Sequence, residues 1–261
     1  MSRTLRVLVT NDDGIGSEGL RWLALAAREA GHEVTVAAPA AEASGSSAAL
    51  TAVEEHGRVV VERRRLPGLD GVAAHSVRAM PGFIALIAAQ GAFGAPPDVV
   101  LSGINRGPNT GRAVVHSGTV GAAVTAAVNG LPAMAVSVEV GSPMEWAGAA
   151  HIARRLLPLL CRTRIAAPVF NVNVPGVPLE RIRGLRHAGL APFGSVRTTV
   201  AERGRGFVRM TLSAAPPAPE PDTDTHLLAR GFATLTVLHP LTAAPAAGLP
   251  PLPDIAPGST A

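Results

Sequence analysis

One stretch near the start of the chain decides the fold that we expect: the apolar run Leu5–Val9 (LRVLV), followed directly by Thr10–Gly14 (TNDDG). A short run rich in valine and leucine is typical of a strand buried inside a parallel sheet. The glycines that follow permit a sharp turn into a helix. Two adjacent carboxylates, Asp12 and Asp13, are therefore expected at the carboxyl end of the strand, which is where open α/β sheets bind ligands.

The aspartate pair has two interpretations. Neighbouring carboxylates repel one another unless a cation or a proton intervenes, so Asp12 and Asp13 indicate a cation site. Aspartates that follow strands also cap helices and form turns, so the pair is equally compatible with a helix cap beside a solvated neighbour. Taken by itself, the pair leaves both interpretations open.

Apolar runs and turn residues alternate along the first two thirds of the chain. We expect helices at residues 17–30, 81–92, 120–128 and 144–160, and strands at 33–38, 98–101, 133–138 and 169–174. Two β-like runs between residues 50 and 80 predict a small antiparallel excursion. Because βαβ units join parallel strands by right-handed connections, the pattern predicts a doubly wound, mostly parallel, Rossmann-like α/β sheet with helices on both faces.

The last third of the chain changes character. Residues 181–213 alternate in a β-like way around two glycines and predict a C-terminal β-hairpin arm, and residues 231–238 predict one more strand. We therefore divide the chain into an α/β core, a segment with the arm and the returning strand, and a tail rich in Pro and Ala: residues 1–180, 181–242 and 243–261.

Composition excludes several classes of protein. The chain has 261 residues, of which 47% are hydrophobic and 16% are charged, and this suits a globular protein. All 23 basic residues are arginines, yet the net charge is only +4. The densest basic run, Arg63–Arg65, is short and is interpreted as a solvated strand end. Polymeric nucleic acid is therefore not expected as a main partner.

The chain has one cysteine, Cys161, so it forms no internal disulfide and no cysteine-based metal site. Its apolar neighbours predict a buried side chain. The aspartate pair comes too early for a signal peptide, and no apolar run reaches the length of about 18 residues that a membrane helix needs. We expect a soluble, cytoplasmic protein without a membrane partner.

Further polar motifs fall on the same predicted edge as the aspartate pair. Ser44-Gly45 follows the strand at 33–38, Ser102–Gly111 follows the strand at 98–101, and Ser117-Gly118-Thr119 begins the helix at 120–128. Loops dense in Gly, Asn and Ser turn backbone N–H groups toward anions, and helix N-termini bind phosphate. Each motif by itself is more typical of an ordinary turn or cap.

In this order and at these separations, the motifs resemble the survival protein SurE family of metal-dependent 5′/3′-nucleotidases. The strings that carry the resemblance are Asn11–Gly14, Ser44-Gly45, Ser102–Asn105 and Ser117–Val120. It extends through Gly107–Asn109, Asn171–Pro175, Thr223-Asp224 and Gly231–His239, and so covers most of the chain.

The resemblance implies one divalent cation, Mg²⁺ or Mn²⁺, and such an all-oxygen ligand set suits either metal. The implied ligands are Asp12, Asp13, Ser44 and Asn105, of which Asp12, Asp13 and Asn105 are also the expected catalytic residues. The implied contacts of the substrate phosphate are Asn11, Gly45, Asn109, Ser117, Gly118 and Thr119. The cation would polarise a phosphoryl oxygen and activate a water, releasing an alcohol and inorganic phosphate.

Two histidines belong to segments that the family uses near its site. His116 either contacts the phosphate and gives a proton to the leaving group, or only fills a position where the family has Tyr. His239 is either a substrate contact or a surface histidine. Both alternatives stay open for each residue.

The chain departs from the family pattern around the implied metal ligands. Ala79-Met80-Pro81 and then Phe83-Ile84 stand where the family has Gly-Thr-Pro and then Asp-Cys, and Thr125 replaces an acidic residue. Ala41 and Glu42 stand where the family often has Arg and Asn. These departures put the substrate in doubt more than the reaction.

Three functions are consistent with these residues. The first is a divalent-metal-dependent phosphomonoesterase acting on nucleoside 5′(3′)-monophosphates. The second is a phosphatase retargeted to another phosphorylated metabolite, as in specialised biosynthesis. The third is a nucleotide- or phosphate-binding module without turnover. The resemblance also implies a homodimer or homotetramer, with the hairpin arm as a candidate for exchange between subunits.

Overall fold

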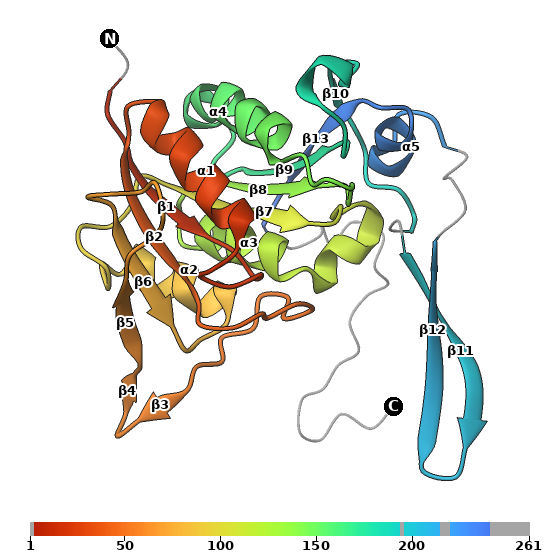
Figure 1. Ribbon diagram of the computed structural model, residues 1–261, viewed down its shortest axis with the longest axis horizontal. Helices are drawn as coiled ribbons and strands as arrows, with labels where there is room; N and C mark the ends of the chain where they lie inside the picture. The colour runs from red at the N-terminus through yellow and green to blue at the C-terminus, as the bar shows by residue number, and fades with distance from the viewer. Residues whose placement is uncertain (1–2, 194–195, 215–219, 241–261) are drawn as a thin grey trace, which may run out of the picture.

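The structure is a computed structural model that describes residues 3–193, 196–214 and 220–240. The tail predicted at 243–261 lies outside the described residues. A central sheet with helices on both faces forms the body of the molecule, and a long hairpin extends away from it (Figure 1). The predicted fold class is therefore confirmed, whereas the division of the chain at residues 180 and 242 stays a prediction.

The elements have the following bounds. The helices are α1 (Glu18–Glu29), α2 (Pro81–Ala89), α3 (Gly118–Val128), α4 (Trp146–Arg162) and α5 (Asp224–Ala229), with short 3₁₀ turns at Gly111–His116 and Leu179–Arg181. The strands are β1 (Arg6–Thr10), β2 (Glu33–Pro39), β3 (Glu54–Glu55), β4 (Arg58–Val59), β5 (Val61–Arg64), β6 (Ala73–Val77), β7 (Val99–Arg106), β8 (Ala133–Val138), β9 (Val169–Val174), β10 (Leu185–His187), β11 (Val196–Gly204), β12 (Phe207–Ala214) and β13 (Ala233–Leu238).

Nine strands form the main sheet in the order β10-β13-β9-β8-β7-β1-β2-β6-β5. The six strands from β9 to β6 are parallel, and antiparallel neighbours appear only where β13 meets β9 and where β5 meets β6. The chain leaves β1 for β2 on one side and later returns with β7 on the other side, so the strand order reverses at β1. Ligands bind in α/β sheets outside the carboxyl ends of the strands at such a reversal.

Two hydrophobic cores lie on opposite faces of this sheet. Val7 and Val9 of β1 pack with α1 and α4, whereas Leu8 packs with α2 and α3. Alternate residues of a strand point to opposite faces, so the continuous apolar run of β1 contributes to both cores. The sheet is thus a buried, rigid platform for the residues at its carboxyl edge.

The sheet extends further into one polar motif than the sequence predicts. We expected residues 102–111 to be a loop, but β7 continues to Arg106 with a register shift between Ser102 and Asn105. Gly103 makes this possible, because its φ is +131° and a Cβ there would lie 2.2 Å from the carbonyl oxygen of Val136. Asn105 is consequently held by a strand.

The C-terminal third holds three further differences from the prediction. The hairpin is confirmed, but it begins at Val196, and the earlier β10 pairs with β13 in the main sheet. Helix α5 was not predicted. The prediction that Cys161 is buried was wrong: it is exposed, because the buried face of α4 passes through Leu157 and Leu160 and leaves Cys161 toward solvent.

The predicted excursion between residues 50 and 80 is present as the β3-β4 hairpin and as β5, which runs antiparallel to β6. The side chains of β5 are exposed, including Arg63 and Arg64, so the basic run lies on a solvated strand as expected. Among the described residues, no helix combines the length and the apolar character that a membrane span requires.

Candidate functional site

A cleft of 580 Å³ opens at the carboxyl edge of the sheet, over the ends of β1 and β7. Eight residues from four separate segments of the sequence contribute polar groups or close backbone approach to it: Asp12, Asp13, Glu42, Ser44, Gly45, Asn105, Asn109 and Ser117. Arg106, Ala113 and His116 complete its lining. The topology therefore brings most of the predicted site residues into one place.

Asp12 lies at the base of this cleft and is only 4% exposed. The hydroxyl of Thr119, which is fully buried, donates a hydrogen bond to Asp12 Oδ1. Burial raises the pKa of Asp12 above its usual value, and the Thr119 hydrogen bond opposes that rise. Thr119 thus orients the carboxylate from behind.

Asp13 is half-buried and has a more perturbed environment. Its Oδ2 accepts a weak hydrogen bond of 3.4 Å from the backbone N–H of Arg106. Burial, followed by the neighbouring charge of Asp12, raises the pKa of Asp13 to about 6. Within the described parts of the chain, neither aspartate forms an ion pair. Two carboxylates are therefore held side by side without an ion-pair partner among the described residues, although the charge of Arg106 partly opposes the rise in the pKa of Asp13.

Ser44 and Asn105 present oxygen atoms at the same cleft. The Ser44 hydroxyl donates to Glu42 Oε1 over 2.8 Å, which leaves the lone pairs of its oxygen available. The Asn105 side-chain Nδ2 donates to the carbonyl of Gly107 over 2.7 Å, so its Oδ1 is the atom free to act as a ligand. Sequence reasoning did not assign Glu42 to the site, although an acidic residue two positions before Ser44 was a visible signal.

The loop that carries Ser44 is fixed against the start of α3. Ser47 donates its hydroxyl to the carbonyl of Val115 over 2.7 Å and its backbone N–H to the carbonyl of His116 over 3.2 Å. A Cβ at Gly121 would lie 2.0 Å from the carbonyl oxygen of Ser47, so only glycine permits this contact. The loop and the helix therefore hold the two walls of the cleft in one arrangement.

At the N-terminus of α3, only Ser117 lines the cleft, and the residues that follow it lie behind Asp12. Ser117 lines the cleft, but its hydroxyl caps the helix by accepting the N–H of Val120 over 3.1 Å. A Cβ at Gly118 would lie 2.8 Å from Asp12 Oδ2. Gly118 and Thr119 thus support the carboxylate, and hydrogen bonds from their backbone N–H groups oppose the rise in the pKa of Asp12.

Asn109 is held by a network of buried polar side chains on β8 and β9. Its backbone N–H donates to Asn173 Oδ1 over 2.7 Å, and its side-chain Nδ2 donates to Ser137 Oγ over 2.9 Å. Its carbonyl accepts from the side-chain Nδ2 groups of Asn171 and Asn173, each over 2.9 Å. Asn109 is therefore a fixed part of the cleft wall.

A buried carboxylate on α5 fixes the next turn of the chain. Asp224 is fully buried, and its two oxygens accept the backbone N–H groups of Gly111 over 2.8 Å and of Ala191 over 3.0 Å. Sequence reasoning noted Thr223-Asp224 only as part of a resemblance and missed this role. Asp224 ties the C-terminal segment to the segment that leads to His116.

Besides Gly118 and Thr119, two more residues predicted to contact the substrate do not line the cleft. Asn11 is fully buried, and its Nδ2 donates to the carbonyl of Gly14 and to Ser17 Oγ, which joins the end of β1 to the cap of α1. His239 follows β13, whose Leu238 pairs with Val169 at the start of β9. Because β13 runs antiparallel to β9, His239 lies at the opposite edge of the sheet in this chain, and its contact with the substrate stays a prediction.

The donor atoms of the cleft fit a hard divalent cation. Two carboxylates without an ion-pair partner among the described residues line the same cleft as a hydroxyl and an amide oxygen, and Mg²⁺ and Mn²⁺ prefer oxygen ligands of this kind. No cluster of three or more His, Cys, Asp or Glu side chains suited to a metal occurs among the described residues. The oxygens of Ser44 and Asn105 are therefore needed to complete a ligand set with Asp12 and Asp13.

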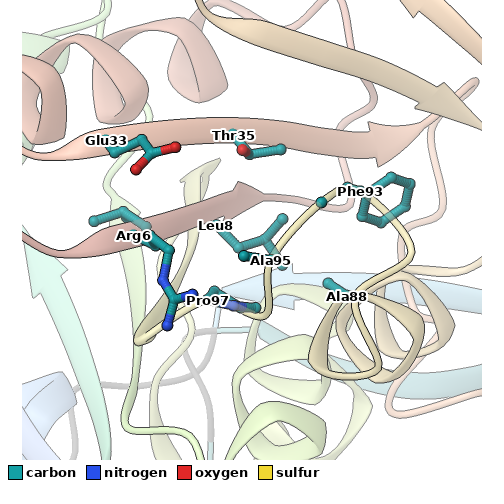
Figure 2. Close-up of a pocket in the computed structure, with 10 residues that line it drawn as sticks. Arg6, Leu8, Glu33, Thr35, Ala88, Phe93, Ala95 and Pro97 are labelled. Atoms are coloured by element: carbon teal, nitrogen blue, oxygen red, sulfur yellow. The ribbon is translucent and has the colours of Figure 1, made fainter.

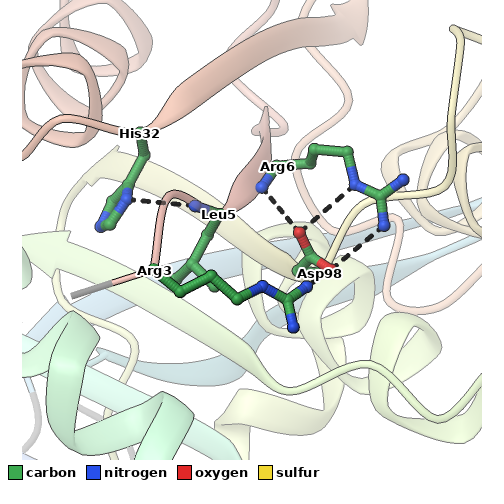
Figure 3. Close-up of polar contacts among 5 residues, drawn as sticks. All are labelled: Arg3, Leu5, Arg6, His32 and Asp98. Carbon is green, nitrogen blue, oxygen red and sulfur yellow. Dashed lines mark hydrogen bonds and ion pairs between the residues drawn. The ribbon is translucent and has the colours of Figure 1, made fainter. Parts of the chain in front are cut away.

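The opposite edge of the sheet is built differently. A cavity of 80 Å³ lies there between β1, β2 and the segment that follows α2, as Figure 2 shows, and it is too small for a nucleotide. Nearby, Asp98 accepts hydrogen bonds from the backbone N–H of Arg6 over 2.8 Å and from the guanidinium groups of Arg6 and Arg3 (Figure 3). The Arg6 hydrogen bonds lower the pKa of Asp98.

Comparisons with known proteins agree on one family. The family model described as survival protein SurE matches residues 7–195. The chain is 35% identical to the 5′-nucleotidase SurE of Syntrophobacter fumaroxidans, over 90% of this chain and 93% of that protein. It is 36% identical to the 5′-nucleotidase SurE of Carboxydothermus hydrogenoformans, over 90% of each chain. The crystal structure of the SurE protein from Aquifex aeolicus matches with a TM-score of 0.74 and 26% identity, over 91% of this chain and 94% of that one.

Proposed function

This chain belongs to the SurE family, and from that premise we propose that it is a divalent-metal-dependent phosphomonoesterase acting on nucleoside 5′(3′)-monophosphates. The observation that carries the proposal is the pair of carboxylates, Asp12 and Asp13, held at the reversal of the strand order without an ion-pair partner in the described chain. Ser44 and Asn105 supply the other protein oxygens. The curated relatives with 31–36% identity that are named 5′-nucleotidase SurE support the substrate class.

We expect the residues of the cleft to have different roles. Asp12, Asp13, Ser44 and Asn105 would hold one Mg²⁺ or Mn²⁺. When bound, such an ion polarises a phosphoryl oxygen and lowers the pKa of a bound water. Ser117 at the start of α3 and Gly45 on the facing loop line the space for the phosphate, and Gly45 allows a close approach. Asn109 lines another part of the cleft and is kept in place by its bonds to Asn171 and Asn173.

His116 lies on the cleft wall and is the candidate proton donor to the leaving alcohol. An alkoxide leaving group needs this proton more than p-nitrophenolate does. The variant His116→Asn should therefore lower kcat for a nucleoside monophosphate by about tenfold or more and change kcat for p-nitrophenyl phosphate far less. Equal losses on both substrates would show that His116 only shapes the cleft.

A screen of substrates against metals tests the proposed activity. Full-length protein should release phosphate from AMP or GMP with Mn²⁺ or Mg²⁺, and the activity should disappear with EDTA or with Asp13→Ala. Inactivity on all nucleoside monophosphates with several metals would contradict the proposal. Asp98→Ala, at the opposite edge of the sheet, is the matched control for loss of an aspartate.

Retargeting to another phosphorylated metabolite is the second candidate, favoured by Glu42 and Met80 near the cleft. A screen of catalytic efficiency over nucleotides and sugar phosphates separates the two, because a clear preference for nucleotides would exclude retargeting. Binding without turnover is the third candidate. Ligand binding by calorimetry together with absent phosphate release would support it.

The hairpin supports a homodimer or homotetramer. Four large apolar side chains of β11 and β12 are exposed by 48–59%: Val200, Phe207, Val208 and Met210. A second subunit that covers this hairpin would bury them. Light scattering should find an oligomer for the full chain and a smaller species when the hairpin is replaced by a short turn. We also place the enzyme in the cytoplasm, which fractionation of cells would check.

A further inference from the structure

A second cavity opens directly beside the cleft, and Glu42 lines both spaces. It has a volume of 230 Å³ and lies between the ends of β2 and β6 and the segment at 51–53. The wall between the two spaces is residues 40–45. The backbone N–H of Ala43 in this wall donates to the carbonyl of Asp12 over 2.7 Å, so the cavity has a fixed position relative to the carboxylates.

The walls of this cavity are mostly aliphatic. Pro39, Val77 and Ala79 are buried beneath it, and Met80 and Ala52 form its sides. The basic side chain in its lining is Arg78, whose Nη1 donates to Glu55 Oε1 over 2.9 Å. The cavity therefore suits an uncharged organic group better than a second phosphate.

Glu42 gives the cavity one polar contact at the boundary with the cleft. Its Oε1 accepts the hydroxyl of Ser44, and in the described part of the chain its Oε2 has no hydrogen-bond partner. A carboxylate oxygen accepts hydrogen bonds only, so its complement on a ligand is an N–H or O–H group. It also repels a ligand that brings additional negative charge.

Four of the positions where this chain departs from the sequence pattern of the family lie around this cavity. Ala41, Glu42, Ala79 and Met80 are among the departures noted in the sequence, and all four line it. Two stretches almost 40 positions apart in the chain have thus diverged around one space while the metal-ligand set has stayed intact.

We propose that this cavity is the subsite for the leaving group of the substrate, and that it takes an uncharged ring, such as a nucleobase, with an N–H or O–H donor facing Glu42. This inference rests on the proposed function, because a phosphate in the cleft places the alcohol part of the ester beside it. Glu42 makes the enzyme select monophosphates over substrates that carry a second phosphate.

Filling the cavity tests the subsite. Ala41 is exposed, so Ala41→Phe narrows the cavity without disturbing the core, and Ala92→Phe at the opposite edge of the sheet is the matched control. The full-length protein with Mn²⁺ is tested on AMP and on acetyl phosphate, which has a small leaving group. Binding of adenosine to the same samples is measured by calorimetry.

Ala41→Phe should raise KM for AMP and weaken adenosine binding by about tenfold or more, as expected for a blocked apolar pocket. Turnover of acetyl phosphate should stay within about twofold of wild type, because the cleft and the cation ligands are untouched. Ala92→Phe should behave as wild type. Glu42→Gln, which still accepts the Ser44 hydroxyl, should raise activity on adenosine 3′,5′-bisphosphate relative to AMP.

Every other outcome contradicts the subsite, the proposed function, or both. Equal effects of Ala41→Phe on AMP and acetyl phosphate, with unchanged adenosine binding, would overturn the subsite and leave the proposed function standing. Adenosine binding that Ala41→Phe abolishes, in a protein that releases no phosphate from either compound, would overturn the proposed function and support the subsite. A wild-type protein that shows neither binding nor turnover would overturn both.

Discussion

The aspartates at the two edges of the sheet have opposite environments. At the amino edge, Asp98 accepts hydrogen bonds from Arg6 and Arg3, and its pKa is lowered. At the carboxyl edge, Asp12 and Asp13 have no ion-pair partner in the described chain, and their pKa values are raised. The first arrangement stabilises the folded chain, and the second costs stability until a cation neutralises it.

This difference shows which carboxylates serve the fold and which serve a ligand. The aspartate at the amino edge lies 17% exposed between two arginines, so its environment is complete. The pair at the carboxyl edge has an incomplete environment, because its hydrogen bonds come from the Thr119 hydroxyl and the backbone N–H of Arg106, and the charge of Arg106 does not outweigh burial. Perturbed carboxylates in a cleft are candidates for function on this physical ground.

The largest expected effect is on activity. Asp13→Ala should lower phosphate release from AMP by about a thousandfold or more, because several kcal/mol of charge stabilisation in the transition state depend on the cation. Asp98→Ala should leave kcat within about twofold of wild type. Steady-state kinetics of both variants, with folding checked by circular dichroism, measure the contrast. A large loss of kcat in Asp98→Ala would contradict the distinction between the two edges.

The next largest effect is on the free energy of unfolding, and its sign should differ between the two edges of the sheet. In EDTA, Asp13→Asn should raise the free energy of unfolding by about 1 kcal/mol, because it removes a half-buried charge without a partner and solvent screens part of the gain. Asp98→Asn should lower it by about 1–2 kcal/mol, because it weakens charge-assisted hydrogen bonds. Urea unfolding measures both. The same sign for the two variants would contradict the distinction between the edges.

The pH dependence should differ between the edges as well. The pKa of Asp13 is raised from 3.8 to about 6, so its unfavourable contribution is present above pH 6 and disappears as the pH falls from 6 toward 3.8. The pKa of Asp98 is lowered, so its favourable contribution is present above 3.8 and disappears as the pH falls below that value.

Without metal, the stability gained through Asp13→Asn should therefore shrink between pH 7 and pH 5, while the stability lost through Asp98→Asn should stay constant over that range. Urea unfolding in EDTA at both pH values measures this. A constant difference between wild type and Asp13→Asn would show that the pKa of Asp13 is not raised.

The smallest effect concerns the outer arginine of the amino edge. Arg3 is 76% exposed, and an ion pair at such a site contributes little. Arg3→Ala should change the free energy of unfolding by less than about 0.5 kcal/mol, and salt should reduce even that change. Urea unfolding at low and high salt checks this. A loss as large as that of Asp98→Asn would mean that Arg3 and not Arg6 holds the carboxylate.

The sequence predicted the sheet and the carboxylate edge because both depend on local patterns. The run before Asp12 had to be a buried strand, and parallel strands bring their carboxyl ends together. The extension of β7 was not predictable, because it depends on Gly103 meeting the carbonyl of Val136 from a neighbouring strand. Contacts between distant segments have no local signature.

The same reason explains the residues that sequence reasoning misplaced. Asp224 acts on Gly111 across more than 100 positions of the chain, and nothing near it in the sequence indicates that contact. His239 was separated from the cleft by the antiparallel direction of β13, and direction depends on pairing with β9. Cys161 was exposed because the helical phase of α4 outweighed its apolar neighbours.

The most direct test of the cation site is a thermal unfolding titration with Mn²⁺ on wild type, Asp13→Asn and Asp98→Asn. A ligand that binds only the folded state raises the midpoint as its concentration increases. Wild type and Asp98→Asn should both show that rise, and Asp13→Asn should not. Equal rises in all three proteins would contradict the assignment of the carboxyl-edge aspartates as the cation site.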